Sequence, residues 1–157
     1  MKRQMLLLAA LLMVGLGAWA QKAEQKFNPK KFQVFAVGFY NQENLFDTCH
    51  DAGKNDYEYL PAKGWNSEKY TSKLKNMSRT LADMGTDVLP DAGCAFIGLA
   101  EVENANVLRD LTAQPPLKAR NMQFCHIEGP DKRGIDCALL YNPALFTVKN
   151  VKLVPYV

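Results

Sequence analysis

Apolar and polar positions alternate in blocks along this chain, and the blocks predict strands and helices in a regular order. Apolar runs rich in β-forming residues predict strands at residues 32–40, 95–100, 121–127 and 135–141, and alternation predicts one more at 145–154. Apolar residues at helical spacing predict a helix from Asn66 or Ser67 to Gly85, and Asn104 begins a short helix that ends near Leu111. This order is typical of an α/β fold, in which helices cover a mixed sheet.

The first 20 residues have the layout of an export signal. A positively charged start, an apolar run at residues 5–16 and the small-x-small cleavage site Ala18-Trp19-Ala20 follow one another. The apolar run is shorter than the roughly 20 residues that a membrane span needs. We therefore expect a signal peptide at 1–20, a flexible lead-in at 21–31, a periplasmic or extracellular location, and no stable membrane span after cleavage.

Charge and length change this picture little. The net charge is +3 and falls to +1 when Lys2 and Arg3 are removed, so it gives no argument for a polyanion as partner. One domain is expected at residues 32–157. The last run stops at Tyr156-Val157 with no capping helix, and a sheet that ended there would have an open edge or an uncovered face. We therefore expect the domain to be truncated at its C-terminus.

Four cysteines, Cys49, Cys94, Cys125 and Cys137, would enter an oxidising compartment. Their spacing has no Cys-x-x-Cys metal pattern, and disulfide connectivity cannot be read from a sequence. Cys125 and Cys137 fall on two predicted strands that look like neighbours. We favour buried small hydrophobic side chains over a bridge.

Carboxylate and amide side chains follow two of the predicted buried strands. Glu101 and Glu103 come after the strand at 95–100, and Asn41 comes after the strand at 32–40. If the strands are parallel neighbours, their carboxyl ends place these groups on one rim, where oxygen atoms can hold a hard cation such as Mg²⁺. The alternative is that the residues start a helix and a turn, as N-caps and loop asparagines do.

A polar loop before the predicted strand at 135–141 carries a third group. Arg133 has the planar guanidinium that grips phosphate, and Asp131 lies two residues before it. Asp136 is expected either to orient a catalytic histidine elsewhere in the protein or to satisfy backbone groups at the strand start. His126 could carry a proton, but a single histidine at a strand end is more often structural.

Three segments, taken in order, resemble the endonuclease/exonuclease/phosphatase superfamily, and most of all its secreted Bacteroidetes branch. They are residues 39–47 (FYNQENLFD), 98–104 (GLAEVEN) and 129–141 (GPDKRGIDCALLY). The resemblance covers about residues 32–154. It implies an α/β (α+β) sandwich of the deoxyribonuclease-I-like four-layer kind, with two packed sheets and helices outside, of which this chain would hold roughly the N-terminal half.

The resemblance also implies metal-dependent hydrolysis of a phosphate ester. Glu101 would bind Mg²⁺, with Mn²⁺ or Ca²⁺ as alternatives, and Asn41 would act in catalysis at the cation and the phosphate. Asp136 would also belong to the catalytic set, and Asp131 and Arg133 would border the substrate. The substrate stays open between nucleic acid, a sugar or inositol phosphate, and a phospholipid head group. No protein partner is implied.

The chain departs from the family's pattern after Tyr141. The family also needs a later Asp-x-Asn and a terminal Asp-His pair, whereas this part of the sequence has two asparagines, Asn142 and Asn150, and no aspartate or histidine. We therefore expect little or no hydrolysis by this chain alone. The alternatives are a non-catalytic secreted binding domain on the same scaffold and a fragment that does not fold.

Overall fold

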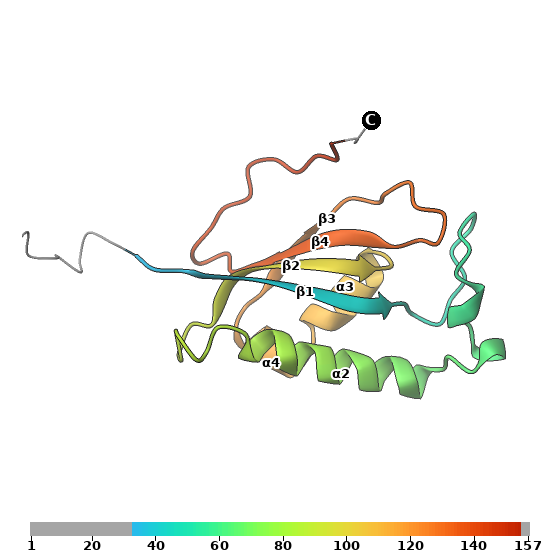
Figure 1. The fold of residues 1–157 in the computed structure, drawn as a ribbon, viewed down its shortest axis with the longest axis horizontal. Coiled ribbons are helices and arrows are strands. Elements are labelled where there is room, and N and C mark those ends of the chain that lie inside the picture. Colours follow the sequence, from blue (N-terminus) through green and yellow to red (C-terminus); the bar gives the residue numbers. More distant parts are fainter. Residues whose placement is uncertain (1–32, 155–157) are drawn as a thin grey trace, which may run out of the picture. The chain divides into compact units, whose positions relative to one another are not determined.

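The centre of the computed structural model, which describes residues 33–154, is a mixed four-stranded sheet (Figure 1). Its strands are β1 (Ala36–Leu45), β2 (Cys94–Val102), β3 (Gln123–His126) and β4 (Asp136–Tyr141), in the order β1-β2-β4-β3. β1 and β2 are parallel, whereas β4 runs antiparallel to both β2 and β3. The predicted α/β class, a mixed sheet with helices, is confirmed.

Helices cover one face of this sheet (Figure 1). The Asn66 side chain accepts a hydrogen bond from the Lys69 amide at the start of the long helix, and the Asn104 side chain accepts two at the start of the next. Both starts agree with the sequence prediction, because a side-chain oxygen at the N-cap satisfies amides that the helix leaves free. The helical elements are α2 (Ser67–Asp83), α3 (Ala105–Thr112), α4 (Pro115–Ala119) and the 3₁₀ turns η2 (Tyr57–Tyr59) and η3 (Pro61–Lys63).

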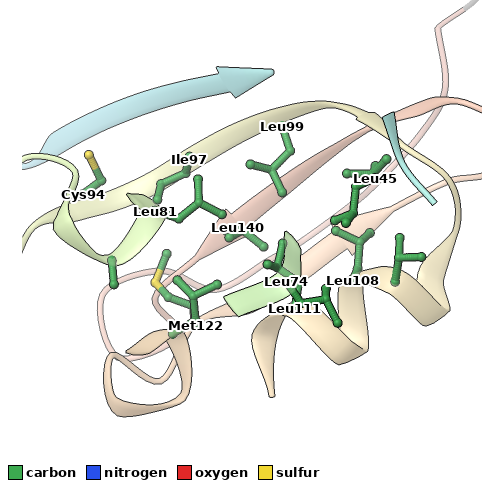
Figure 2. Close-up of a cluster of buried hydrophobic side chains, with 14 residues drawn as sticks. Leu45, Leu74, Leu81, Cys94, Ile97, Leu99, Leu108, Leu111, Met122 and Leu140 are labelled. Carbon is green, nitrogen blue, oxygen red and sulfur yellow. The ribbon is translucent and has the colours of Figure 1, made fainter. Parts of the chain in front are cut away.

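The hydrophobic core lies between the sheet and its helices (Figure 2). Strand side chains alternate between faces, so every second residue of β2 and β4 points into this core. The side chains that meet there include Leu45, Leu74, Leu81, Ile97, Leu99, Leu108, Leu111 and Leu140. Burying such a side chain stabilises the fold by about 1.5–3 kcal/mol. A one-residue slip of β2 would turn its apolar residues outward, so the core fixes the position of the carboxyl end of β2.

The opposite face of the sheet is largely uncovered. Val37 and Phe39 of β1 are 71% and 68% exposed. The segment after β4 contributes Phe146, whose ring packs on Phe96 with 4.0 Å between centroids. The strand predicted at 145–154 is wrong, because this segment packs a ring on the sheet face and pairs with no strand of the described residues. A segment with alternating apolar residues forms a strand only where its backbone can hydrogen-bond to the free edge of a sheet.

The boundaries of the two parallel strands also differ from the prediction. The strand predicted to end at residue 40 is longer, because β1 continues to Leu45, which pairs with Val102. β2 continues past Ala100 and takes in Glu101. Polar residues continue both strands: Asn41 and Glu43 are exposed and Gln42 is buried, while the backbone still belongs to the sheet. The hydrophobic pattern alone therefore ends the strands too early.

The cysteine prediction holds in part. All four thiols are free, and Cys94 is buried. Cys49 and Cys137 are exposed, which contradicts the expected burial. Cys137 lies beside Leu139 on the uncovered face of β4, so its strand position alone does not bury it.

The predicted signal peptide at 1–20 and lead-in at 21–31 lie outside the described residues. Among residues 33–154, no helix combines the length and the apolar character needed to cross a membrane.

Candidate functional site

The carboxyl ends of β1 and β2 bring Asn41 and Glu101 to one edge of the sheet. The two strands are parallel and end on the same side (Figure 1). Asn41 pairs with Ala100, so Glu101 is the next residue along the neighbouring strand. The arrangement expected from the sequence, an amide and a carboxylate on one rim, is therefore present in the fold.

Strained backbone marks this rim. Glu43, Asn44 and Glu101 have φ angles of 50°, 62° and 59°, in the left-handed region that residues other than glycine seldom adopt. Each such conformation costs on the order of 1–2 kcal/mol and persists only where the surroundings enforce it. The regular pairing of β1 with β2 is interrupted between Asn41 and Leu45, where two of these residues lie. Such strain concentrates at functional sites.

Hydrogen bonds hold the two candidate ligands in place. The Glu101 Oε2 atom accepts a hydrogen bond from the Asn44 amide at 3.0 Å. The Asn41 Oδ1 atom accepts one from the Glu43 amide, also at 3.0 Å. The irregular stretch of β1 therefore supplies the amides that orient both side chains.

Lys73 of α2 supports the same stretch from the helix side. Its ammonium group donates to the Glu43 and Asn44 carbonyl oxygens. It also lies 5.8 Å from the centroid of the Trp65 ring. Burial lowers the pKa of Lys73, while the nearby carboxylates of Glu43 and Glu101 act to raise it. No local pattern in the sequence marks Lys73 for this role.

The donor atoms at the rim fit a divalent cation of the magnesium kind. Glu101 offers a carboxylate and Asn41 an amide oxygen, and such hard oxygen ligands are what Mg²⁺ prefers. Among the described residues, Oε1 of Glu101 accepts no hydrogen bond, which leaves it free for a ligand. Mg²⁺ sites commonly take one or two protein ligands and complete the shell with water and substrate phosphate. Glu43 is exposed beside them.

Glu103 lies beneath the rim and has a different role. Its side chain is 1% exposed, and Oε2 accepts a hydrogen bond from the Asp47 amide at 2.8 Å, while Oε1 has no partner. Burial raises the pKa of Glu103 to about 8, the Asp47 amide opposes this, and the charges of Asp47, Asp51 and Asp56 add to it. Glu103 thus anchors the chain that leaves β1 and is not exposed on the rim where the sequence placed it.

The loop after β1 is tied down by its own acidic residues. Asp56 is buried, pairs with the His50 ring and accepts a hydrogen bond from the Asp51 amide at 2.7 Å. Asp51 in turn accepts one from the Asn104 side chain at 3.0 Å. The carboxylates of Asp51 and Asp56 therefore have a structural role. They hold in place the segment that follows Asp56, which returns towards the rim.

Asp136 and His126 form a buried pair at the base of the loop between β3 and β4. The His126 Nε2 and Asp136 Oδ2 atoms are 3.0 Å apart, and both side chains are almost fully buried. The second oxygen of Asp136 accepts a hydrogen bond from the Gly129 amide at 2.8 Å. Both oxygens thus have partners inside the protein. Asp136 thus satisfies a backbone amide near the strand start, which is one of the two expected alternatives, and its histidine partner is His126.

Lys54 holds this loop from the other side. Its ammonium donates to the carbonyls of Gly129 and Asp131 and lies 3.1 Å from a Glu128 carboxylate oxygen. The neighbouring Asn55 amide donates to the Lys132 carbonyl at 2.7 Å. The segment with Lys54 and Asn55 is therefore joined to the loop between β3 and β4, next to Arg133.

The predicted substrate-binding residues, Asp131 and Arg133, are exposed on this loop. The Arg133 amide donates to Asp131 Oδ1 at 2.7 Å, and the Arg133 Nε atom is 3.7 Å from the same oxygen. The Arg133 side chain lines a cavity of about 610 Å³ with Asn44 and Tyr59. Burial raises the pKa of Tyr59, and its hydroxyl is also influenced by the charges of Glu101 and Arg133. One cavity thus connects the rim to the loop.

His126, Glu128 and Asp136 also satisfy the spacing of metal ligands, since one donor atom of each lies within 4.8 Å of the others. Two observations weigh against a cation there. Asp136 already uses both oxygens, and the Lys54 ammonium sits at the Glu128 carboxylate. The oxygen rim of Asn41 and Glu101 is therefore the better candidate.

Sequence reasoning missed Lys54, Lys73, Tyr57 and Tyr59. A signal existed for the tyrosines, because they lie in the long loop after a strand, a usual place for functional residues. No local pattern marks the lysines. Their importance comes from backbone carbonyls that the fold brings to them.

Comparison with known proteins agrees with this geometry. The model of a family described as the endonuclease/exonuclease/phosphatase family matches residues 36–157. No curated protein and no solved structure matches the chain.

Proposed function

Because this chain belongs to the endonuclease/exonuclease/phosphatase family, we propose that its strand-end rim serves a cation-dependent hydrolysis of a phosphate ester. The family supports a phosphoester hydrolase in general terms. The proposal for this chain rests on one observation above all: Glu101 is held in a strained conformation at the carboxyl end of β2, with one carboxylate oxygen left free.

Each residue of the rim has a proposed role. Glu101 and Asn41 would hold Mg²⁺, or Mn²⁺ or Ca²⁺ in its place. The cation, when bound, supplies positive charge that stabilises negative charge on the phosphate oxygens. Arg133 would donate to the phosphate through its planar guanidinium. Asp136 acts from a distance, because its buried carboxylate fixes the loop that carries Arg133.

Hydrolysis depends on more groups than the cation ligands Glu101 and Asn41 alone. Cation binding is therefore the sharper test. Isothermal titration with Mg²⁺, and with Mn²⁺ followed by electron paramagnetic resonance, measures it directly. Glu101→Gln is expected to weaken binding at least tenfold, because the substitution removes the ligand's charge. Glu68→Gln, an exposed change in the first turn of α2, is the matched control and leaves affinity unchanged.

Equal cation affinity in wild type and Glu101→Gln would contradict the proposal. That result would favour the non-catalytic binding domain instead.

We further propose that residues 1–20 direct export. Expression in a bacterial host, followed by fractionation and intact-mass measurement, tests it. Cleavage after Ala20 is expected, and an uncleaved cytoplasmic product would contradict it.

A further inference from the structure

The acidic residues beneath the rim leave a buried oxygen atom without a partner. The Glu103 side chain is 1% exposed, and among the described residues nothing donates a hydrogen bond to its Oε1 atom. Its other oxygen, Oε2, accepts the hydrogen bond from the Asp47 amide. Nearly all buried polar atoms in proteins pair with a protein group, an ordered water or an ion, so an unpaired carboxylate oxygen points to a ligand.

Two aspartates of the loop after β1 offer further oxygen atoms. Asp47 Oδ1 accepts a hydrogen bond from the Cys49 amide at 2.6 Å, and Asp51 Oδ2 accepts one from the Asn104 side chain at 3.0 Å. The second oxygen of each side chain accepts none within the described part of the chain, and both residues are half-buried. Glu103, Asp47 and Asp51 thus share one pattern, with one oxygen held by the protein and one free.

The charge around Glu103 is negative, and no basic side chain of the described residues balances it. Burial raises the pKa of Glu103, the charges of Asp47, Asp51 and Asp56 raise it further, and only the Asp47 amide opposes them. Asp56 uses both of its own oxygens, on the His50 ring and on the Asp51 amide. Carboxylates gathered without a counter-charge attract a cation, and Asp56 adds to this attraction without serving as a ligand.

The type and spacing of the free oxygens favour Ca²⁺. All three are carboxylate oxygens, which bind hard cations such as Ca²⁺ and Mg²⁺ better than soft ones. Within residues 33–154 only His126, Glu128 and Asp136 bring three donor atoms within 4.8 Å of one another, so the set around Glu103 is more open. Mg²⁺ demands a compact, nearly ideal octahedron, whereas Ca²⁺ accepts an irregular shell of about 6–8 oxygens that includes water and backbone carbonyls.

We propose that Glu103, Asp47 and Asp51 bind a Ca²⁺ ion, which fastens the loop after β1 to the end of β2. The ion takes the free oxygen of each carboxylate, directly or through water. It stabilises a contact between segments 56 residues apart, which the hydrogen bond from the Asp47 amide to Glu103 already joins. The proposal goes beyond the proposed function and does not depend on it, because Asn41 and Glu101 supply none of these oxygens.

Terbium luminescence measures binding at this site, because Tb³⁺ replaces Ca²⁺ at oxygen ligands and emits when a nearby indole is excited. Trp65 is suitably placed, since its Nε1 atom donates to the Asp47 carbonyl at 2.8 Å. The measurement uses the Glu101→Gln variant, so that the rim contributes little. We expect a signal that Ca²⁺ displaces with a Kd of about 10⁻⁴–10⁻³ M, the range of extracellular calcium modules, and that Mg²⁺ displaces about tenfold less readily.

Thermal unfolding provides a second measurement, on the wild-type protein. At about 10 mM Ca²⁺, the melting temperature is expected to rise by about 4–12 °C over its value in EDTA. Glu103→Gln keeps an oxygen for the Asp47 amide but removes the charge, so it is expected to weaken Ca²⁺ binding about tenfold and to remove most of the rise. Asp51→Asn is expected to do the same from a half-buried position. Glu68→Gln is the exposed control and keeps the full rise.

The outcomes separate this site from the rim. A rise in melting temperature that persists in both Glu103→Gln and Asp51→Asn would overturn the proposal. The absence of any signal that Ca²⁺ displaces would overturn it too, since a proton would then satisfy the Oε1 atom. Loss of the rise in both variants, with Mg²⁺ binding at Glu101 intact, supports it. Ca²⁺ binding that is unchanged in Glu101→Gln supports the calcium site even if the proposed function fails.

Discussion

Replacement of Glu103 by glutamine is expected to stabilise the protein in a pH-dependent way. The Glu103 carboxylate is buried among three aspartates, and one of its oxygens has no partner. Glutamine has almost the same shape, keeps an oxygen for the Asp47 amide and carries no charge. The substitution therefore isolates the cost of a buried charge from the packing of the side chain.

The size and sign of the effect follow from the pKa of Glu103, which is raised from 4.5 to about 8. An acid with a raised pKa holds its proton more tightly in the folded than in the unfolded state. The free energy of unfolding therefore falls as the pH rises from 4.5 to about 8, and it is constant above that. At ~1.4 kcal/mol per pH unit, this loss is about 5 kcal/mol at most.

Urea unfolding followed by circular dichroism, in EDTA, at pH values from 5 to 9 measures the difference between Glu103→Gln and wild type. We expect a difference of less than about 1 kcal/mol at pH 5 and a gain of about 3–5 kcal/mol for the variant at pH 9. Glu68→Gln provides the exposed control and should show no such trend. If the difference in free energy of unfolding between Glu103→Gln and wild type stays constant from pH 5 to pH 9, the reasoning is refuted. Ionisation of the Glu103 carboxylate would then not destabilise the folded state.

Three further substitutions test other parts of the structure. Gln42→Val should raise stability by about 1–3 kcal/mol, because the Gln42 amide nitrogen and oxygen are buried without partners; thermal unfolding measures this, with exposed Gln123→Val as control. Gly129→Ala should cost about 1–3 kcal/mol and weaken phosphate binding, because a Cβ there would clash with Asp136 Oδ1; an unchanged melting temperature would contradict this close packing of Gly129 on Asp136. Lys73→Met should cost about 1–3 kcal/mol by leaving the Glu43 and Asn44 carbonyls without their donor, and urea unfolding without any loss would show that water replaces it.

Local features of the sequence predicted the elements that frame the site. The apolar runs located the strands, and Asn66 and Asn104 marked helix starts because a cap depends on only a few neighbouring residues. The rim followed from these elements, since parallel neighbours end on the same side of a sheet. Asn41 and Glu101 could therefore be placed together without a structure.

What the sequence did not predict depends on contacts between distant segments. Lys73 looks like any helix-surface lysine until the end of β1 is placed over it. The burial of Glu103 requires the Asp47–Asp56 loop to cover it. Apolar and polar residues alternate in the segment at 145–154 as in a strand, but whether this segment pairs depends on a free sheet edge formed by other parts of the chain. Such information lies in the topology and not in any local pattern.

The parallel pairing of β1 with β2 also governs when the site can form. Asn41 and Ala100 are register partners, yet the whole of α2 and its flanking loops lies between them in the chain. Closing so long a loop costs entropy before any pairing compensates for it, and such pairings form late and slowly. Arg133 reaches its place beside the rim only after β4 has paired with β2, because it lies in the loop directly before β4. We therefore expect the rim to be among the last parts of the fold to form, after the helices, whose contacts are close in sequence.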